Sequence, residues 1–184
     1  MTDHIRRVLV AYATASGSTA QIAERIGNRL GAVVDVAVRP VGTDGDIDRF
    51  DAFVLGSAVH DMAWLPPARE FAERLAAGRR GRPVWLFSVA GIEPRGRMRR
   101  WMARQETARV ARGLPRGLDP RDHRLFAGVV HLEGVPLWGR LFHALARQRP
   151  GDHRDWAAIE AWSDRIAAAL ATDVEAGGAL GSMR

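Results

Sequence analysis

The sequence predicts an α/β protein built on a doubly wound, parallel five-stranded sheet with helices on both faces. Short apolar segments alternate along the chain with segments of helical periodicity, and short links join them. This alternation is typical of parallel strands connected by crossover helices. The length of 184 residues suits one domain with a sizeable core. We expect this domain to cover residues 1–171, and residues 172–184 to form a disordered tail.

Five apolar segments are predicted as the strands. The third of them, Ala-Phe-Val-Leu-Gly-Ser, is almost continuously apolar, which is typical of a parallel strand covered on both faces. The predicted strands lie at about 6–13, 33–38, 52–57, 83–89 and 125–130.

The first two helices follow the first and third strands. The first covers about residues 19–30 and ends at Gly31, a typical helix stop. Its apolar face comprises Ala20, Ile22, Ala23, Ile26 and Leu30. The second begins at Pro66 and Pro67, because proline is favoured in a first helical turn. Its inward residues are Phe71, Ala72 and Leu75.

Two more helices are predicted near the C-terminus, at about 136–148 and 155–171. The former combines apolar and basic residues, and packing on the sheet explains it more simply than membrane contact. Asp155 is the expected N-cap of the latter. The buried stripe of this last helix is predicted to be Trp156, Ile159, Ile166 and Leu170.

The loop after the first strand, Thr14-Ala15-Ser16-Gly17-Ser18-Thr19, has the composition of a phosphate site. It lies at the positive N-terminus of a helix, where an anion is stabilised. A Walker loop would need a lysine, and a dinucleotide fingerprint would need three glycines, whereas this loop has only Gly17. Hydroxyl and backbone N–H groups suit a single terminal phosphate. The alternative is that the hydroxyl groups only cap the helix.

The same loop resembles the FMN phosphate loop of flavodoxins, commonly Thr/Ser-x-Thr/Ser-Gly-x-Thr. The resemblance implies FMN as cofactor and the strand order 2-1-3-4-5. Ligands of such sheets lie beyond the carboxyl ends of the strands, and flavodoxin-like proteins enclose the flavin ring with the loops after strands three and four. The expected flavin contacts are Thr14, Ala15, Ser16, Gly17, Ser18, Thr19, Ser57, Ala58, Val59, His60, Ser88, Val89, Ala90 and Gly91.

Further segments resemble the flavodoxin-like branch that contains menaquinone-dependent protoporphyrinogen oxidase. They are Leu55-Gly56-Ser57-Ala58-Val59, Trp64-Leu65-Pro66-Pro67-Ala68 and Val84-Trp85-Leu86-Phe87-Ser88. An insertion between strands four and five, here about residues 92–124, is also characteristic of that branch. The resemblance implies an FMN-dependent oxidoreductase that passes electrons from a reduced organic substrate to a quinone.

The loop after strand three departs from this pattern, because His60 and Asp61 stand where relatives often have an aromatic residue followed by glycine. His60 is the one candidate for a catalytic role, as a flavin contact or proton donor, against a simple loop histidine. Asp61 close to the flavin N1 edge would disfavour an anionic reduced flavin, but would have no effect from solvent. Trp64 either stacks on the flavin or packs under the next helix.

Two other functions stay open on the sequence alone. One is a flavodoxin electron carrier; such carriers usually present an acidic face, and a sequence pI near 11.2 argues against it. The other is a flavodoxin-like binding module with a degenerate flavin site, which the pair His60-Asp61 motivates.

The basic residues are all arginine, 27 in number, which reflects a GC-rich genome more simply than a function. Ten of them fall in the insertion at 92–124, against four acidic residues. This segment favours an anionic substrate or a peripheral membrane contact over nucleic acid, for which no motif is present. The alternative is a solvated, poorly ordered loop. Whether the protein forms a homodimer stays open.

Composition excludes several kinds of chemistry. The chain has no cysteine, so it has no disulfide, iron–sulfur cluster, thiolate zinc site or cysteine nucleophile. His131 and Glu133 lack further ligands at matching spacing, and we expect no metal site. No apolar segment is long enough for a membrane span or has the form of a signal peptide. We expect a cytoplasmic protein, or one peripheral to the inner face of the membrane.

Overall fold

The computed structural model describes residues 7–43, 47–78, 81–90, 110, 112–115, 117–130 and 151–181. Its main sheet consists of five parallel strands in the order β2-β1-β3-β5-β6. This is the predicted 2-1-3-4-5 order, and the prediction of a doubly wound parallel sheet is confirmed. The strands are β1 (Arg7–Ala13), β2 (Asp35–Pro40), β3 (Ala52–His60), β5 (Val84–Ala90) and β6 (Asp122–Ala127).

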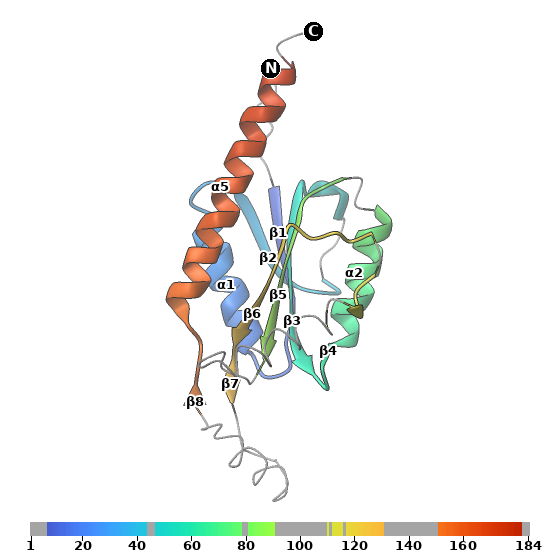
Figure 1. Cartoon of the computed structure of the whole chain (residues 1–184), viewed down its shortest axis with the longest axis vertical. Coiled ribbons are helices and arrows are strands. Elements are labelled where there is room, and N and C mark those ends of the chain that lie inside the picture. Colours follow the sequence, from blue (N-terminus) through green and yellow to red (C-terminus); the bar gives the residue numbers. More distant parts are fainter. Residues whose placement is uncertain are drawn as a thin grey trace, which may run out of the picture.

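Helices cover both faces of the sheet (Figure 1). Helices α1 (Ser18–Leu30) and α5 (Trp156–Gly181) lie side by side on one face, and α2 (Pro66–Gly78) covers the other. The predicted N-cap of α5 is confirmed, because the Asp155 carboxylate accepts a 3.0 Å hydrogen bond from the backbone N–H of Ala158. A short 3-10 helix, Ile47–Arg49, precedes β3.

Three very short strands were not predicted. Strand β4 (Ala63–Trp64) pairs antiparallel with the end of β3, and β7 (Val129–Val130) pairs antiparallel with β8 (Gly151–Asp152). A two-residue strand has no measurable hydrophobic period, so its partner alone defines it. Both pairs lie near the carboxyl ends of the main strands (Figure 1).

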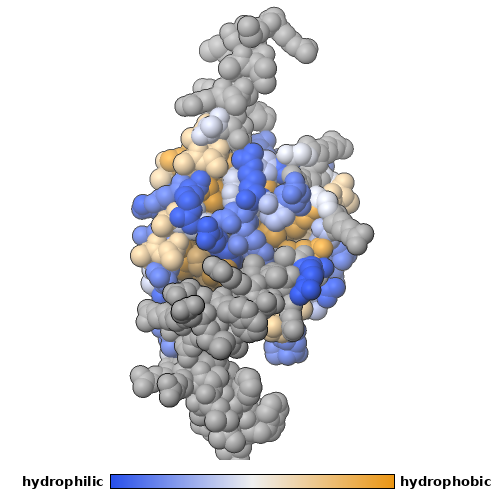
Figure 2. Space-filling model, in the orientation of Figure 1, coloured by the Kyte–Doolittle hydropathy of each residue, from blue (hydrophilic) through white to orange (hydrophobic). Residues whose placement is uncertain are grey.

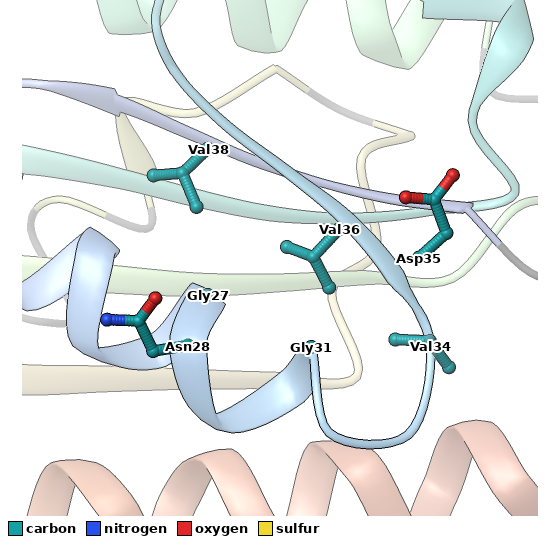
Figure 3. Close-up of a pocket in the computed structure, with 7 residues that line it drawn as sticks. All are labelled: Gly27, Asn28, Gly31, Val34, Asp35, Val36 and Val38. Atoms are coloured by element: carbon teal, nitrogen blue, oxygen red, sulfur yellow. The ribbon is translucent and has the colours of Figure 1, made fainter.

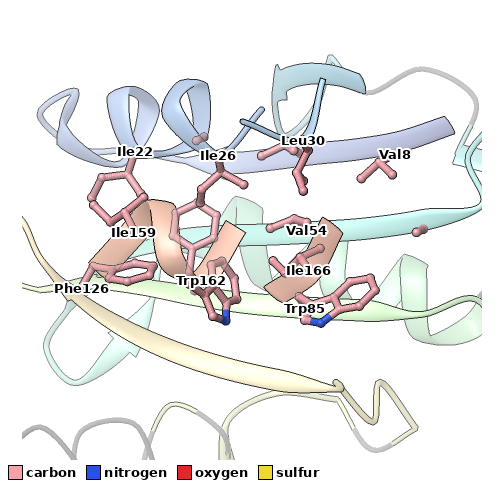
Figure 4. Close-up of a cluster of buried hydrophobic side chains, with 14 of the residues drawn as sticks. Val8, Ile22, Ile26, Leu30, Val54, Trp85, Phe126, Ile159, Trp162 and Ile166 are labelled. Atoms are coloured by element: carbon pink, nitrogen blue, oxygen red, sulfur yellow. The ribbon is translucent and has the colours of Figure 1, made fainter. Parts of the chain in front are cut away.

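The core on the α1 and α5 face joins side chains from both helices and the central strands (Figure 4). Trp162 of α5 is its largest buried side chain, with ring centroids 5.6 Å from Phe126 and 6.2 Å from Phe87. The sequence-predicted stripe of α5 omitted Trp162, while Ile159, Ile166 and Leu170 are buried as predicted. The stripe is therefore wider than the spacing of isoleucine and leucine suggested.

The core on the α2 face uses the alternate residues of the same strands. Leu9 and Leu55 face α2, whereas their neighbours Val8 and Val54 face α1. The second predicted helix is confirmed, and its buried residues toward the sheet are Ala68, Phe71, Ala72 and Leu75. Burial on both faces explains why the central strands are apolar throughout.

The fifth predicted strand is shifted in the structure. We expected about residues 125–130, but β6 begins at Asp122 and ends at Ala127. A carboxylate opens the strand because Trp162 donates its indole N–H to it at 2.9 Å and Arg124 donates at 2.9 Å. The predicted insertion at 92–124 therefore ends before Asp122, and residues 91–109 lie outside the described residues.

The C-terminal segment also differs from the prediction. We expected a disordered tail from residue 172, whereas α5 continues to Gly181. Residues 172–181 contain two alanines and three glycines, so local helix propensity does not explain the longer helix. The predicted helix at 136–148, with His131 and Glu133, lies outside the described residues.

On the face of the molecule that Figure 2 shows, hydrophilic side chains are interspersed with apolar ones. Among the large apolar side chains that the structure describes, only Val33 and Met62 are classed as exposed. No helix in the described part of the chain combines the length and apolar character that a bilayer crossing needs.

Candidate functional site

Three loops of the predicted site follow the carboxyl ends of parallel strands, at the lower edge of the sheet in Figure 1. Strand β1 ends beside β3, with Ala13 paired to Ser57, and β3 ends beside β5, with Ser57 paired to Ser88. The sheet thus brings together three segments that are far apart in the sequence. Of the expected flavin contacts, only Gly91 lies outside the described residues.

The β1–α1 loop turns sharply at Gly17. Its φ of 88° lies in the left-handed region, where only glycine is unstrained, and its N–H donates to Thr14 Oγ1 at 2.9 Å. A Cβ at Gly17 would meet no atom within 4 Å among the described residues, so the backbone opens onto free space. Gly17 is also the N-cap of α1, and no side chain caps that helix. The first N–H groups of α1 are therefore open to a ligand.

Thr19 provides the decisive polar atom in this loop. Its Oγ1 is fully buried and has no hydrogen-bond partner among the described residues. Every other buried side-chain oxygen or nitrogen in the described part of the chain has a partner. Leaving a buried hydroxyl unpaired costs about 1–3 kcal/mol, and native proteins rarely do so without a reason. An anion at the open N-terminus of α1 would accept this hydrogen bond. The loop is therefore built for a ligand, and not only to cap the helix.

Strand β6 closes the space behind this loop. Gly128, the residue after β6, donates its N–H to the Ala90 carbonyl at 2.9 Å. A Cβ on Gly128 would come within 2.8 Å of Val89 Cγ1 and 3.3 Å of Ser18 Oγ. Only glycine fits here, so the ends of β5 and β6 lie directly against the N-terminus of α1.

The end of β3 forms a tight hairpin with β4. His60 pairs with Ala63, and the two residues between them have positive φ, 50° at Asp61 and 63° at Met62. Two successive positive φ values define a type I′ turn, which favours Asn-Gly. The aspartate tolerates this conformation, but the methionine is strained in it.

The two polar side chains of this hairpin point into solvent. The His60 side chain is 78% exposed and that of Asp61 is 94% exposed, with 3.9 Å between His60 Nε2 and Asp61 Oδ2. Asp61 is therefore too solvated to oppose a charge on a buried ligand. The hairpin itself is held by Ser57, whose buried Oγ accepts the Leu65 N–H at 3.1 Å and donates to the Ala58 carbonyl at 2.8 Å.

Ser88, near the end of β5, is fully buried between two aromatic side chains. Its Oγ accepts the Trp64 indole N–H at 2.7 Å and lies 2.9 Å from His123 Nε2. Because the indole can only donate, the Ser88 hydroxyl is left to donate to a neutral His123. Burial lowers the pKa of His123 to about 4, partly offset by the charge of Asp122.

Trp64 is thereby assigned to packing. It is buried, its ring lies edge-on to His123 with centroids 6.0 Å apart, and it belongs to the core under α2. The alternative interpretation, that Trp64 stacks on a flavin, does not fit this position. Ser57 and Ser88 were expected to contact the cofactor, but both hydroxyl groups are used to hold the loops.

Comparison with known families identifies the fold. The model of the flavodoxin domain family matches residues 9–155, most of the chain. The chain belongs to the flavodoxin domain family. No curated protein matches the sequence.

Solved structures agree on the fold. A rubredoxin oxygen:oxidoreductase of Desulfovibrio gigas superposes with a TM-score of 0.59 at 17% identity, over 90% of this chain and 36% of that one. A short-chain flavodoxin associated with a PDU bacterial microcompartment gives a TM-score of 0.51 at 13% identity, over 77% of this chain and 97% of that one. This flavodoxin domain thus spans about a third of the length of the oxidoreductase it resembles.

The flavodoxin domain uses FMN, and the described residues fit the phosphate end of that cofactor. The fit rests on the uncapped N-terminus of α1, the left-handed Gly17 and the unpaired Thr19 hydroxyl. Thr14 and Ser16 add hydroxyl groups at the partly exposed rim of the loop. The residues expected to contact the flavin ring form the ring side of the site. They are Ala58, Val59 and His60 at the hairpin, and the buried Val89 and Ala90 at the end of β5.

Arg154 is a site residue that sequence reasoning missed. Its guanidinium stacks on Trp156 at 4.6 Å, pairs with Asp152 at 2.6 Å and contacts the side chain of Gln21, one turn into α1. The hydrogen bond from Arg154 lowers the pKa of Asp152 to about 2 and raises the pKa of Arg154. The flavodoxin domain therefore has a cation near the phosphate loop, largely balanced by one carboxylate. The only sequence signal was the nearby pair of opposite charges.

Among the described residues, no three carboxylate or imidazole side chains come together in a way that could hold a metal ion. A small cavity of about 130 Å³ lies beside the hairpin, lined by apolar residues of β4 and of the segment before β6, together with Arg69. Its lining residues are Met62, Ala63, Trp64, Arg69, Val110, Gly113 and Leu114.

Proposed function

We propose that this flavodoxin domain is an FMN-dependent oxidoreductase that passes electrons from a reduced organic substrate to a quinone. The observation that supports FMN most strongly is the buried, unpaired Thr19 hydroxyl at the uncapped N-terminus of α1. When bound, the flavin supplies the transfer of electrons or hydride. The protein supplies orientation and electrostatics.

The residues of the β1–α1 loop hold the phosphate in this proposal. Thr19 donates its hydroxyl proton, the backbone N–H groups that follow Gly17 point to the same place, and the helix dipole adds positive potential. Thr14 already accepts the Gly17 N–H, so its own hydroxyl proton is available to a phosphate oxygen. The phosphate charge is stabilised here by dipoles and hydrogen bonds, and the nearby Arg154 is already paired with Asp152.

The ring side of the proposed site is rigid for a different reason. Ser57 fixes the start of β4 through the Leu65 N–H, and Ser88 ties Trp64 to His123. A fixed hairpin keeps its orientation when an electron pair arrives or leaves. The exposure of the His60 side chain at the edge of that hairpin supports a contact with a substrate or partner that approaches from solvent.

The finer proposal, a role like that of menaquinone-dependent protoporphyrinogen oxidase, is supported by the sequence resemblance and by the arginine-rich insertion. Porphyrinogen carboxylates and acidic lipid headgroups are both anionic partners for such a segment. Two arginines near its end have internal partners: Arg121 stacks on Trp85 at 5.3 Å, and Arg124 pairs with Asp122 at 2.9 Å. The contact with an anionic partner is proposed for the arginine-rich segment as a whole, on its charge alone.

The test uses the full chain reconstituted with FMN under anaerobic conditions. We expect protoporphyrinogen to bleach the flavin absorption and a soluble quinone to restore it, with two electrons and two protons delivered to each quinone. The heat-denatured protein with the same FMN is the control for free flavin. If the reconstituted protein neither oxidises protoporphyrinogen nor reduces the quinone, the enzymatic proposal is wrong. Salt-sensitive electron transfer to a protein partner alone would then indicate an electron carrier.

A further inference from the structure

The outer edge of β2 is open in the described part of the chain. Strand β2 pairs with β1 on one side, and no described strand pairs with it on the other. Its residues are half-buried or exposed, whereas the central strands are almost wholly buried. In Figure 3 this strand crosses the front of the view above the C-terminal turn of α1. An open strand edge is a template for pairing with another strand.

Backbone direction shows which groups this edge presents. The Val41 N–H donates to the Tyr12 carbonyl of β1 at 2.9 Å, so residues 35, 37, 39 and 41 direct their backbone groups toward β1. The backbone N–H and C=O groups of Val36 and Val38 therefore point outward. Pro40 would be the next outward residue, but proline has no N–H, so the available ladder ends there.

The sequence of this strand is complementary to itself. In Asp35-Val36-Ala37-Val38-Arg39, an antiparallel copy centred on Ala37 places Asp35 opposite Arg39 and Val36 opposite Val38. We propose that β2 pairs antiparallel with β2 of a second copy of this chain, forming a homodimer with one continuous sheet. The two valine pairs are the hydrogen-bonded pairs, and Ala37 meets its own copy in a non-hydrogen-bonded pair.

Charge on the α2 face of the strand favours this register. Asp35 already accepts a 2.8 Å hydrogen bond from Arg7 Nε of β1, and its side chain is still 49% exposed. In the dimer, Asp35 lies between Arg7 of its own chain and Arg39 of the second copy. Opposite charges directly across an antiparallel pair stabilise it, and like charges destabilise it.

On the α1 face of the strand, valine side chains border a shallow groove that Asn28 and Asp35 also line. Val36 and Val38 pack against the core, and a groove of about 510 Å³ runs between them and α1 (Figure 3). Gly27 and Gly31 keep the helix side of this groove low, and the nearby Val33 is 61% exposed. In the dimer, the valines of the second β2 lie beside Val36 and Val38 on this face. The interface leaves the carboxyl ends of the strands, and thus the FMN site, free.

Charge reversal tests the register. In Asp35→Arg, two arginines face each other across the interface, and in Arg39→Asp two aspartates do, so each variant alone is expected to be monomeric. An equimolar mixture of the two restores opposite charges at both contacts, and we expect a heterodimer in sedimentation equilibrium. The wild-type chain is expected to dimerise at micromolar concentration. A wild-type chain that stays monomeric into the millimolar range overturns the proposal, and so does a dimer that neither reversal weakens.

Single cysteines provide a second test, because the natural chain has no cysteine. Ala37→Cys places two thiols across the two-fold axis, within the Cα separation that a disulfide accepts, and should cross-link rapidly under mild oxidation. Asp35→Cys alone should not, because its two copies lie about 13 Å apart along the strand. Asp35→Cys mixed with Arg39→Cys should cross-link as heterodimer. Equal cross-linking of all single variants would show random collision and contradict the proposal.

Discussion

The two sides of the proposed flavin site differ in how their buried hydroxyl groups are hydrogen-bonded. On the phosphate side, Thr19 has no hydrogen-bond partner among the described residues. On the ring side, Ser57 and Ser88 are just as buried, yet both hydroxyl groups are bonded within the protein. An unpaired group prepares a site for a ligand, whereas a paired group builds the frame around it. A buried hydroxyl group near the carboxyl edge of the sheet therefore has opposite consequences for binding and stability, depending on whether it is paired within the protein.

Replacing Ser88 should have the largest effect. Ser88→Ala leaves Trp64 Nε1 without an acceptor and His123 Nε2 without a donor, both of them inside the protein. At about 1–3 kcal/mol for each orphaned group, we expect the free energy of unfolding to fall by roughly 3 kcal/mol. Urea denaturation of the apoprotein measures this loss.

The matched control is Ser163→Ala. Ser163 is as fully buried as Ser88, but its hydroxyl only donates to the Ile159 carbonyl, which α5 also satisfies. Its removal should cost less than about 1 kcal/mol. Equal losses for the two variants would show that the Trp64–Ser88–His123 contacts add nothing to stability.

Lowering the pH should reduce the free energy of unfolding through protonation of His123. The pKa of this histidine is about 4 in the folded protein and 6.5 in its ordinary state, so the unfolded chain binds the extra proton as pH falls. The free energy of unfolding should therefore drop between pH 6.5 and 4, by roughly 3 kcal/mol at most. Asp122 stays ionised in this window, because its pKa lies below the ordinary value of an aspartate. Burial would raise this pKa, but hydrogen bonds from Arg124 and Trp162 lower it by more.

Urea denaturation at several pH values measures this slope. His123→Gln cannot take up the proton, and it should lose most of the pH dependence within this window. A wild-type slope that persists unchanged in this variant would assign it to other groups.

Thr19 should respond in the opposite sense. Thr19→Val removes an unpaired buried hydroxyl with little change of shape, so the apoprotein should become more stable by about 1 kcal/mol. The same change removes a phosphate donor, and the Kd for FMN should rise roughly tenfold, or about 1.4 kcal/mol. Thr172→Val is the control, because this exposed hydroxyl of α5 already donates to the Ala168 carbonyl. A destabilised apoprotein with unchanged FMN affinity would contradict this account of Thr19.

The hairpin turn should give the smallest effect. Met62→Gly relieves a left-handed methionine, and we expect thermal denaturation to show a gain of about 1 kcal/mol. Met62→Ala keeps the Cβ that causes the strain, so it should give no comparable gain. If alanine and glycine stabilise equally, the side chain of Met62 and not its backbone is responsible.

The strand–loop–helix unit that carries the proposed phosphate site could be predicted from the sequence because its signal is local, and phosphate binding by it stays a prediction. Thr14, Gly17 and Thr19 follow one another in a single loop between a strand and a helix, and the helix direction fixes their role. The shift of the fifth strand was missed because Asp122 is polar, and its partner Trp162 is distant in the sequence.

The ring side could be predicted only in outline. Ser57 and Ser88 were placed correctly at the ends of their strands, but their hydrogen-bond partners could not be inferred. Leu65, Trp64 and His123 reach these hydroxyl groups through a hairpin and a neighbouring strand. Such long-range hydrogen bonds decide whether a buried hydroxyl group is available to a ligand, and no local sequence pattern predicts them.

The most direct test of the phosphate site compares FMN with riboflavin, which has the same ring and no phosphate. Quenching of flavin fluorescence gives both Kd values for the wild-type chain and for Thr19→Val. We expect wild type to bind FMN at least about a hundredfold more tightly than riboflavin, a difference of about 2.7 kcal/mol. The Thr19 variant should weaken FMN binding and leave riboflavin unchanged. Equal affinities of the wild-type chain for FMN and riboflavin would contradict a phosphate site in the β1–α1 loop.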